Sequence, residues 1–391
     1  MFSMLRIARA SIPRAIYTSF FSTTSAVKQQ PNKLTSLSDS YSLITKALLD
    51  PSNLVNKDSQ PVSDALSRIS RLLDYTVPLG KQFRGNAVVS TLKTMEPFLK
   101  DPLDDKLLLE AHAVGWSLEL AQAALLVSDD MMDGSETRRG KPCWYKIKEI
   151  GTTAVNDVMI LQNSVSRVLQ HFVKDHKEYN NISSLMLDLM DKTLIGQIMD
   201  NETNGPGQEK LELSKYTLER YFNIVLYKTA YYTVNHPIRL GFYLAGFSDP
   251  EFHSDAEDVL LLMGQFFQVQ DDFLDVFGDP AVTGKIGTDI QDGKCNWPVV
   301  KALEKADGKQ RKTLEQHYGV KSKDSVKEVL RVYNELKIKE EYQEFERKQN
   351  ELIKKRIQEF ANKRKKLVWS EKSFPQNVFT DYLEKLVGRK A

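Results

Sequence analysis

Two clusters of aspartates stand out in the sequence because their spacing brings several carboxylates together. Each has the pattern Asp-Asp-x-x-Asp and follows a long stretch with almost no charge; they are Asp129, Asp130 and Asp133, and Asp271, Asp272 and Asp275. On an α-helix residues four apart share a face, so the first and last aspartates of each cluster are predicted to point together. Carboxylates this close raise one another's pKa, and a divalent cation would relieve their repulsion.

A hard divalent cation, with Mg²⁺ as the first choice, is the predicted metal. Mg²⁺ typically takes one or two carboxylates and completes its coordination shell with substrate phosphates. A calcium-binding loop is excluded, because it needs oxygen ligands at alternate positions, where this chain has Met131 and Phe273. The only cysteines are Cys143 and Cys295, so a disulfide scaffold and a cysteine zinc site are excluded as well.

Basic residues accompany both clusters and occur at two further places in the chain. They are Lys81, Arg84, Arg138, Arg139, Lys228, Lys285 and Lys294. Arginine binds phosphate through parallel hydrogen bonds, and lysine contributes a point charge. Together with the aspartates they predict a site for two polyanions, one reached through metal and the other held directly by Lys and Arg. Diphosphate is the polyanion we expect.

The elements that carry these residues are predicted to be helices. Apolar residues recur at helical spacing, and no stretch shows the alternation of a strand. The helical stretches are 108–128, 152–173, 183–200, 217–246, 251–277 and 340–366, with loops at 134–143, 201–210 and 278–296. Asp249 and Pro250 supply an N-cap and a first-turn proline. We therefore expect an all-α fold, a single large helical bundle domain at residues 39–391.

Composition narrows the possible partners and locations of the 391-residue chain. Its net charge of +2 gives no reason to expect a nucleic-acid partner, and no apolar run approaches the ~18 residues of a membrane span. Residues 1–38 are rich in Arg, Ser and Thr and contain no acidic residue. This pattern predicts a mitochondrial transit peptide and a location in the matrix. In the alternative, the segment is a disordered tail of a cytoplasmic protein.

Longer stretches around the two clusters resemble the short-chain trans-prenyltransferases, and within them most closely the farnesyl diphosphate synthases. One stretch runs from Asp129 to Gly140 and the other from Phe266 to Cys295. The resemblance extends from about residue 60 to the C-terminus. It implies a homodimer with the all-α isoprenoid synthase fold and a central active-site cavity. It also implies about three Mg²⁺ ions per site, or Mn²⁺ or another divalent ion in their place.

The resemblance further implies a role for each matching residue. The metal ligands would be Asp129, Asp133 and Asp271. The other catalytic residues would include Asp130, Asp272 and Asp275, with Thr229 and Gln268 beside an allylic cation. The allylic diphosphate would be bound by Arg138, Lys228, Lys285 and Lys294. Isopentenyl diphosphate would be bound by Lys81, Arg84, Gln122 and Arg139, and the cavity would also be lined by Gln197 and Asp200.

The implied reaction condenses isopentenyl diphosphate with dimethylallyl or geranyl diphosphate to give farnesyl diphosphate. Ionisation of the allylic substrate, condensation and loss of a proton would follow in that order. The chain departs from the family pattern at several positions. Among them, Leu79 replaces the first glycine of a Gly-Gly-Lys motif, and Ala124 and Leu125 replace aromatic residues that limit chain growth.

These departures leave alternatives open. The same fold could make a geranyl or geranylgeranyl diphosphate, or act as a terpene synthase without condensation. A non-catalytic subunit is the remaining possibility. The complete set of isopentenyl diphosphate residues favours condensation, and the two intact aspartate clusters disfavour a non-catalytic subunit.

Overall fold

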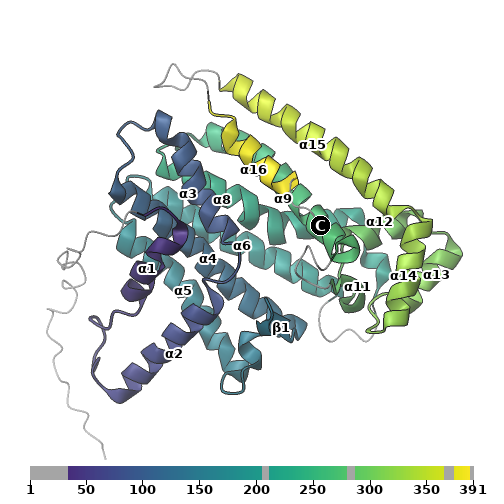
Figure 1. Cartoon of the computed structure of the whole chain (residues 1–391), viewed down its shortest axis with the longest axis horizontal. Coiled ribbons are helices and arrows are strands. Elements are labelled where there is room, and N and C mark those ends of the chain that lie inside the picture. Colours follow the sequence, from purple (N-terminus) through teal and green to yellow (C-terminus); the bar gives the residue numbers. More distant parts are fainter. Residues whose placement is uncertain (1–33, 205–210, 280–286, 365–373, 388–391) are drawn as a thin grey trace, which may run out of the picture. The chain divides into compact units, whose positions relative to one another are not determined.

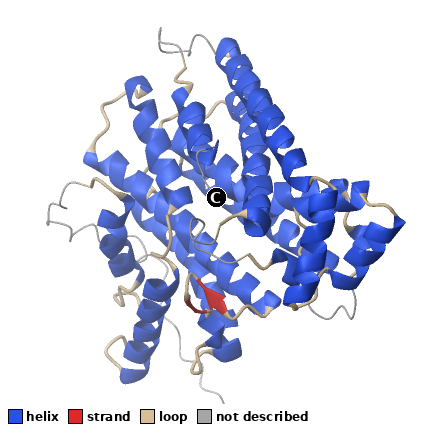
Figure 2. Cartoon of the chain, turned by 45° about the vertical axis from the view of Figure 1, so that its right-hand side comes forward, coloured by secondary structure: helices blue, strands red, loops and turns tan. Residues whose placement is uncertain are grey.

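The computed structural model describes residues 34–204, 211–279, 287–364 and 374–387. This part of the chain is almost entirely helical, and its only strands form one short hairpin (Figure 2). The predicted all-α fold class is confirmed. The helices are α1 (Tyr41–Leu48), α2 (Gln60–Thr76), α3 (Phe83–Met95), α4 (Asp105–Asp133), α5 (Ala154–Phe172), α6 (Tyr179–Asn204), α7 (Leu218–Ile224), η7 (Val225–Asn235), α8 (His236–Leu244), α9 (Pro250–Phe277), α11 (Asp289–Asp292), α12 (Trp297–Lys305), α13 (Gly308–His317), α14 (Lys323–Glu335), α15 (Ile338–Lys363) and α16 (Asn377–Val387).

Helix α4 carries the first aspartate cluster in its last turn. Its N-cap is Asp104, whose side chain accepts a hydrogen bond from the backbone N–H of Leu107 at 2.7 Å. Every side chain from Ala111 to Ala124 is buried, because α3 and α5 pack against it. The helix ends at Gly134, whose φ of 67° is one that glycine adopts without strain. A helix buried on all sides thus delivers three carboxylates to its own C-terminal end.

Helix α9 carries the second cluster near its C-terminal end. The side chain of Asp249 accepts hydrogen bonds from the backbone N–H groups of Glu251 and Phe252, and Pro250 occupies the first turn. This confirms the predicted N-cap. The helix packs against η7, α12 and α15, and α15 in turn lies beside α16 (Figure 1).

The stretch 217–246 is not the single α-helix that we predicted. The structure divides it into α7, the π-helical segment η7 and α8. In a π-helix the hydrogen bonds run from residue i to i+5, and such segments are frequent at functional sites. The apolar pattern could not reveal the change, because the π-helical segment is only 11 residues long.

The predicted loops hold short elements of their own. Two-residue strands, β1 (Thr137–Arg138) and β2 (Lys141–Pro142), pair antiparallel within 134–143. Helix α11 lies within 278–296. Residues 201–204 of the predicted loop 201–210 are instead helical, because α6 continues to Asn204. Residues 205–210 of that loop and residues 280–286 of the loop 278–296 lie outside the described residues.

Two apolar clusters form the core. The larger cluster contains residues from each of the helices α1 through α6 and from α8. It also contains residues from the first half of α9, the end of α15 and α16. The smaller one surrounds the second half of α9 with residues of α7, α12, α13 and α14. The second aspartate cluster therefore begins where α9 passes into the smaller core.

The described chain begins inside the segment that we assigned to the transit peptide. Leu37 is buried, and its carbonyl accepts a hydrogen bond from the indole N–H of Trp116 at 3.0 Å. Residues 1–33 lie outside the described residues. None of the described helices is both long enough and apolar enough to cross a membrane.

Candidate active site

Carboxylates and lysines from four separate elements meet at the end of α4. The ammonium group of Lys228 on η7 lies 3.3 Å from Asp129 Oδ1 and 2.5 Å from Asp200 Oδ2 of α6. The ammonium group of Lys294, which follows α11, lies 2.7 Å from Asp133 Oδ2 and 3.8 Å from Asp200 Oδ2. Asp129 and Asp133 therefore face the same cationic group, as their i, i+4 spacing requires.

Opposite charges control the ionisation of this group. Burial alone would raise the pKa of Asp200, but Lys228 and Lys294 outweigh it and lower that pKa. Burial would likewise lower the pKa of Lys228, but the charges of Asp200 and Asp129 raise it. The pKa of Asp133 is raised because its burial is only partly offset by Lys294. A cation near Asp133 would favour its ionised form.

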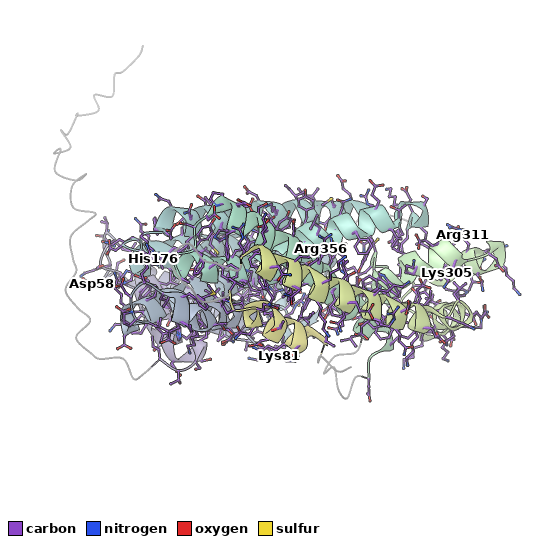
Figure 3. The ribbon with its side chains drawn as sticks, turned by 90° about the horizontal axis from the view of Figure 1, so that it is seen from above. Asp58, Lys81, His176, Lys305, Arg311 and Arg356 are labelled. Atoms are coloured by element: carbon purple, nitrogen blue, oxygen red, sulfur yellow. The ribbon has the colours of Figure 1, made fainter. Side chains whose placement is uncertain are left out.

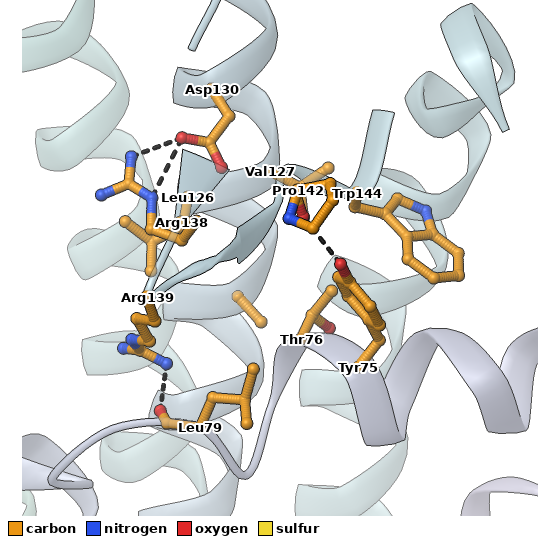
Figure 4. A pocket seen from close by; sticks show the side chains of 11 residues that line it. Tyr75, Thr76, Leu79, Leu126, Val127, Asp130, Arg138, Arg139, Pro142 and Trp144 are labelled. Carbon is orange, nitrogen blue, oxygen red and sulfur yellow. Dashed lines mark hydrogen bonds and ion pairs between the residues drawn. The ribbon is translucent and has the colours of Figure 1, made fainter. Parts of the chain in front are cut away.

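Asp130 has a different environment from its neighbours in the first cluster. The residue is 3% exposed, and its side chain accepts a hydrogen bond from the Nε of Arg138 at 3.0 Å (Figure 4). Arg138 belongs to the β1–β2 hairpin, and its Nη2 also lies 3.7 Å from Asp129 Oδ2. Asp130 thus anchors an arginine beside the cluster.

In the second cluster, too, the middle aspartate is buried and accepts hydrogen bonds from neighbouring residues. Asp272 is buried and accepts hydrogen bonds from Tyr221 OH at 2.6 Å, the backbone N–H of Trp297 at 3.0 Å and Gln268 Nε2 at 2.7 Å. Burial raises the pKa of Asp272 to about 7, although these hydrogen bonds lower it. Asp275 Oδ1 accepts a bond from the backbone N–H of Asp289 at 3.0 Å.

Asp271 and Gln268 lie on the stripe of α9 that meets η7. Gly264 is on this stripe and lies against η7, because a Cβ atom placed there would be only 2.6 Å from Ala230 Cα on η7. Residues four and seven positions further along a helix share its face, so Gln268 and Asp271 continue toward the site. Thr229, the neighbour of Ala230, is buried.

A second cationic group surrounds Arg84 on α3. Its guanidinium group donates hydrogen bonds to Gln122 Oε1 on α4 and, at 2.7 Å, to Thr233 Oγ1 on η7. The Arg84 guanidinium carbon also lies 4.0 Å from the centre of the Tyr232 ring. The structure therefore brings Arg84 and Gln122 together, as the resemblance implied.

Arg139 and Lys81 lie at the edge of this second group. Arg139 donates a hydrogen bond to the backbone carbonyl of Leu79 (Figure 4), and Lys81 is exposed (Figure 3). Gly80 has a φ of 95°, and a Cβ atom there would lie 2.7 Å from Arg139 Cζ. Because Leu79 contributes its backbone, its departure from glycine leaves this contact in place.

The remaining predicted residues are placed as follows. Gln197 is buried on α6, Ala124 is 1% exposed on α4, and Leu125 is half-buried. Lys285 lies outside the described residues. The site also contains Tyr221, Tyr232 and Thr233, which we did not predict. No sequence signal marks them, because each contacts its partner across a separation of 51 residues or more.

Comparisons of this chain with known proteins show the family to which it belongs. The polyprenyl synthetase family model matches residues 67–336, which is more than half of the chain. Farnesyl pyrophosphate synthase of Saccharomyces cerevisiae is 40% identical over 319 residues, covering 81% of this chain and 87% of the yeast protein. The Bos taurus enzyme of that name is 39% identical over 330 residues (84% and 89%), and that of Panax ginseng 41% over 316 residues (80% and 89%). This chain belongs to the polyprenyl synthetase family.

Proposed function

We propose that this chain is a farnesyl diphosphate synthase, which joins isopentenyl diphosphate to dimethylallyl and then to geranyl diphosphate. The observation that carries the proposal is the division of the cationic side chains into two groups. Lys228 and Lys294 lie among the aspartates, whereas Arg84 lies with Gln122. Each group suits one diphosphate, and the names of the relatives support the product.

The lysine group would hold the allylic diphosphate as its C–O bond breaks. Lys228, Lys294 and Arg138 would stabilise the negative charge that grows on the departing diphosphate. Thr229 and Gln268 would present oxygen atoms to the allylic cation. The buried setting of Thr229 would help to exclude the water that destroys such a cation.

The Arg84 group would hold isopentenyl diphosphate beside that cation. With both substrates bound, the double bond of isopentenyl diphosphate can attack the allylic cation without a diffusional encounter. This proximity supplies a large part of the rate increase over the reaction in solution. A new carbon–carbon bond forms, and the resulting cation loses a proton to give the lengthened allylic diphosphate. The released diphosphate is the base we propose.

We further propose that Mg²⁺ binds at Asp129, Asp133 and Asp271. In the described ranges, no three His, Cys, Asp or Glu side chains are close enough together to bind one ion by themselves. These carboxylates therefore suit a metal that takes only one or two of them and completes its shell with diphosphate oxygens. When bound, Mg²⁺ would act as a Lewis acid on the leaving diphosphate.

A homodimer is the assembly that we propose. Helix α6 exposes large apolar side chains at Leu187, Leu194, Ile195 and Ile198, of which Leu187 is 65% and Ile198 58% exposed. Leu187, Leu194 and Ile198 recur at helical spacing and form one stripe. A second copy is the proposed occupant, because the family resemblance implies a dimer and a twofold interface uses the same patch on both subunits.

We also propose that residues 1–38 direct the chain to the mitochondrial matrix. Their basic, acid-free and Ser/Thr-rich composition supports this. A fusion of residues 1–38 to a fluorescent protein is expected to reach mitochondria, and cytosolic fluorescence would contradict the proposal. Cleavage before residue 34 would preserve the contacts of Leu37.

A product assay tests the proposed reaction. The chain without residues 1–33 is incubated with Mg²⁺ and isopentenyl diphosphate, together with dimethylallyl, geranyl or farnesyl diphosphate in separate reactions. Each allylic substrate is also incubated alone. Farnesol that appears only after phosphatase treatment, and only with isopentenyl diphosphate, is the expected product. Geranylgeraniol would show an altered chain length, and a hydrocarbon made without isopentenyl diphosphate would show a terpene synthase.

A further inference from the structure

The π-helical segment η7 is held between two helices that approach its backbone directly. A Cβ atom on Gly196 of α6 would lie 2.6 Å from Lys228 Cα, and one on Gly264 of α9 would lie 2.6 Å from Ala230 Cα. Both distances are shorter than atoms in proteins tolerate, so both positions need glycine. The backbone that carries Lys228 is thereby fixed from two sides.

The winding of η7 sets which of its side chains share a face. Lys228 and Thr233 are five residues apart, the spacing that one turn of i to i+5 hydrogen bonds brings together. On an α-helix the same two residues would lie about 140° apart. The π-helical winding therefore allows one short segment to present Lys228 to the aspartates and Thr233 to Arg84.

The contact between Arg84 and Thr233 is partly buried, and each polar partner in it is defined. Thr233 is fully buried, and its hydroxyl accepts a hydrogen bond from Arg84 Nη2 at 2.7 Å. Its carbonyl accepts a second bond from Tyr382 OH of α16 at 3.0 Å. Tyr232 packs on the same guanidinium group, and Gln122 accepts a bond from its other terminal nitrogen. The plane of the guanidinium group is thus fixed by three side chains from two helices.

We propose that Thr233 is a positioning residue for isopentenyl diphosphate, acting through Arg84, and that the π-helical winding of η7 places it there. This inference rests on the proposed function, because it assigns Arg84 to that substrate. Loss of the hydroxyl would remove the hydrogen-bond partner of Arg84 Nη2 at a partly buried contact. The guanidinium group would then turn away from the geometry needed for bidentate binding of diphosphate.

The test compares two substitutions that differ in the hydroxyl group. Thr233→Val removes the hydroxyl and nearly keeps the shape, and Thr233→Ser keeps the hydroxyl. Thr193→Val is the matched control, because Thr193 is a buried helical threonine whose hydroxyl donates to the carbonyl of Leu189 in its own helix at 2.7 Å. The KM values for isopentenyl and geranyl diphosphate are measured separately with Mg²⁺, and thermal unfolding is recorded for each variant.

We expect Thr233→Val to raise the KM for isopentenyl diphosphate about tenfold or more, and the KM for geranyl diphosphate less than about twofold. Thr233→Ser and Thr193→Val should remain within about threefold of wild type for both. Equal changes in the two KM values, or an unchanged KM for isopentenyl diphosphate, would overturn the inference.

Two further outcomes have a defined meaning. If Thr233→Val does not fold, Thr233→Ala removes the same hydroxyl and replaces it in the comparison. A wild-type chain that forms no product from isopentenyl diphosphate overturns the proposed function itself. If the wild-type chain is active and Thr233→Val has the same KM values as wild type, this inference alone is overturned.

Discussion

Gln268 donates a hydrogen bond from its amide nitrogen to Asp272 Oδ1, 2.7 Å away and one turn further along α9. This bond fixes the orientation of the amide, so that its oxygen atom points away from Asp272. Tyr221 and the backbone of Trp297 hold the other carboxylate oxygen. Asp272 therefore positions Gln268, rather than lying among the lysines as Asp129 and Asp133 do.

Asp272→Asn is expected to reverse the amide of Gln268. The single oxygen of asparagine would stay with Tyr221 and Trp297, so its NH₂ group would face Gln268 and select the flipped amide. We expect kcat to fall on the order of a hundredfold, with a smaller change in KM, as measured by steady-state kinetics.

A compensating substitution distinguishes this account from a loss of packing. Gln268→Glu in the Asp272→Asn background has two carboxylate oxygens, so one can accept from the new NH₂ group while the other faces the site again. We expect part of the lost kcat to return. A double variant no better than Asp272→Asn would contradict the orienting role.

Removal of a proposed metal ligand should abolish activity and leave the fold intact. We expect Asp129→Ala and Asp271→Ala each to lower kcat by about two orders of magnitude or more. Lys228 keeps Asp200 as its partner in the first variant, so thermal unfolding should change little. Asp324→Ala, on an exposed side chain, is the control. Near-wild-type activity with Mg²⁺ present would refute the metal assignment.

Ala124→Phe tests whether this position limits chain growth. Ala124 is 1% exposed and lies five residues before Asp129, so a larger side chain would fill space near the cluster. We expect shorter products or a narrower range of allylic substrates, at a cost in stability of about 1–3 kcal/mol from overpacking.

A neighbouring alanine provides the matched control for that variant. Ala123 is also buried, but it lines a pocket. Figure 4 shows Tyr75 and Trp144 in the lining of the same pocket. Ala123→Phe should share the stability cost and leave the chain length of the product unchanged. Its rate can fall, because Arg138 and Arg139 line the same pocket. The same product profile for Ala124→Phe and wild type would remove Ala124 from the account of chain length.

The exposed stripe of α6 should govern assembly. A glutamate at Leu187 or Ile198 would place charge in the proposed interface, so Leu187→Glu and Ile198→Glu are expected to give monomers in light scattering coupled to gel filtration. Leu352→Glu on α15, where the side chain is 38% exposed, is the control and should remain dimeric. A dimeric Ile198→Glu variant would place the interface elsewhere.

Regular spacing made part of this molecule predictable. The shared face of Asp129 and Asp133, and the N-cap at Asp249, follow from α-helical geometry and are seen in the structure. The contacts of Asp272 could not be predicted in this way. Its partners Tyr221 and Trp297 lie 51 and 25 residues away and meet it only because α7 and α12 pack on α9.

The π-helical segment escaped prediction for a different reason. The difference between i+4 and i+5 winding leaves no mark on apolar spacing over so short a stretch, so 217–246 resembled one α-helix. The Arg84–Thr233 contact depends on that winding and also spans 149 residues. Tertiary packing therefore determines the contact with Thr233 that orients Arg84 in the second cationic group.

Transfer of the isopentenyl carbon skeleton is the most direct test of the proposed reaction. The chain without residues 1–33 would be given geranyl diphosphate, Mg²⁺ and isopentenyl diphosphate uniformly labelled with ¹³C, and the alcohol released by phosphatase would be analysed by mass spectrometry. The account predicts farnesol that carries all the carbons of one labelled isopentenyl unit. A product without label, or no product in the presence of both substrates, would contradict it.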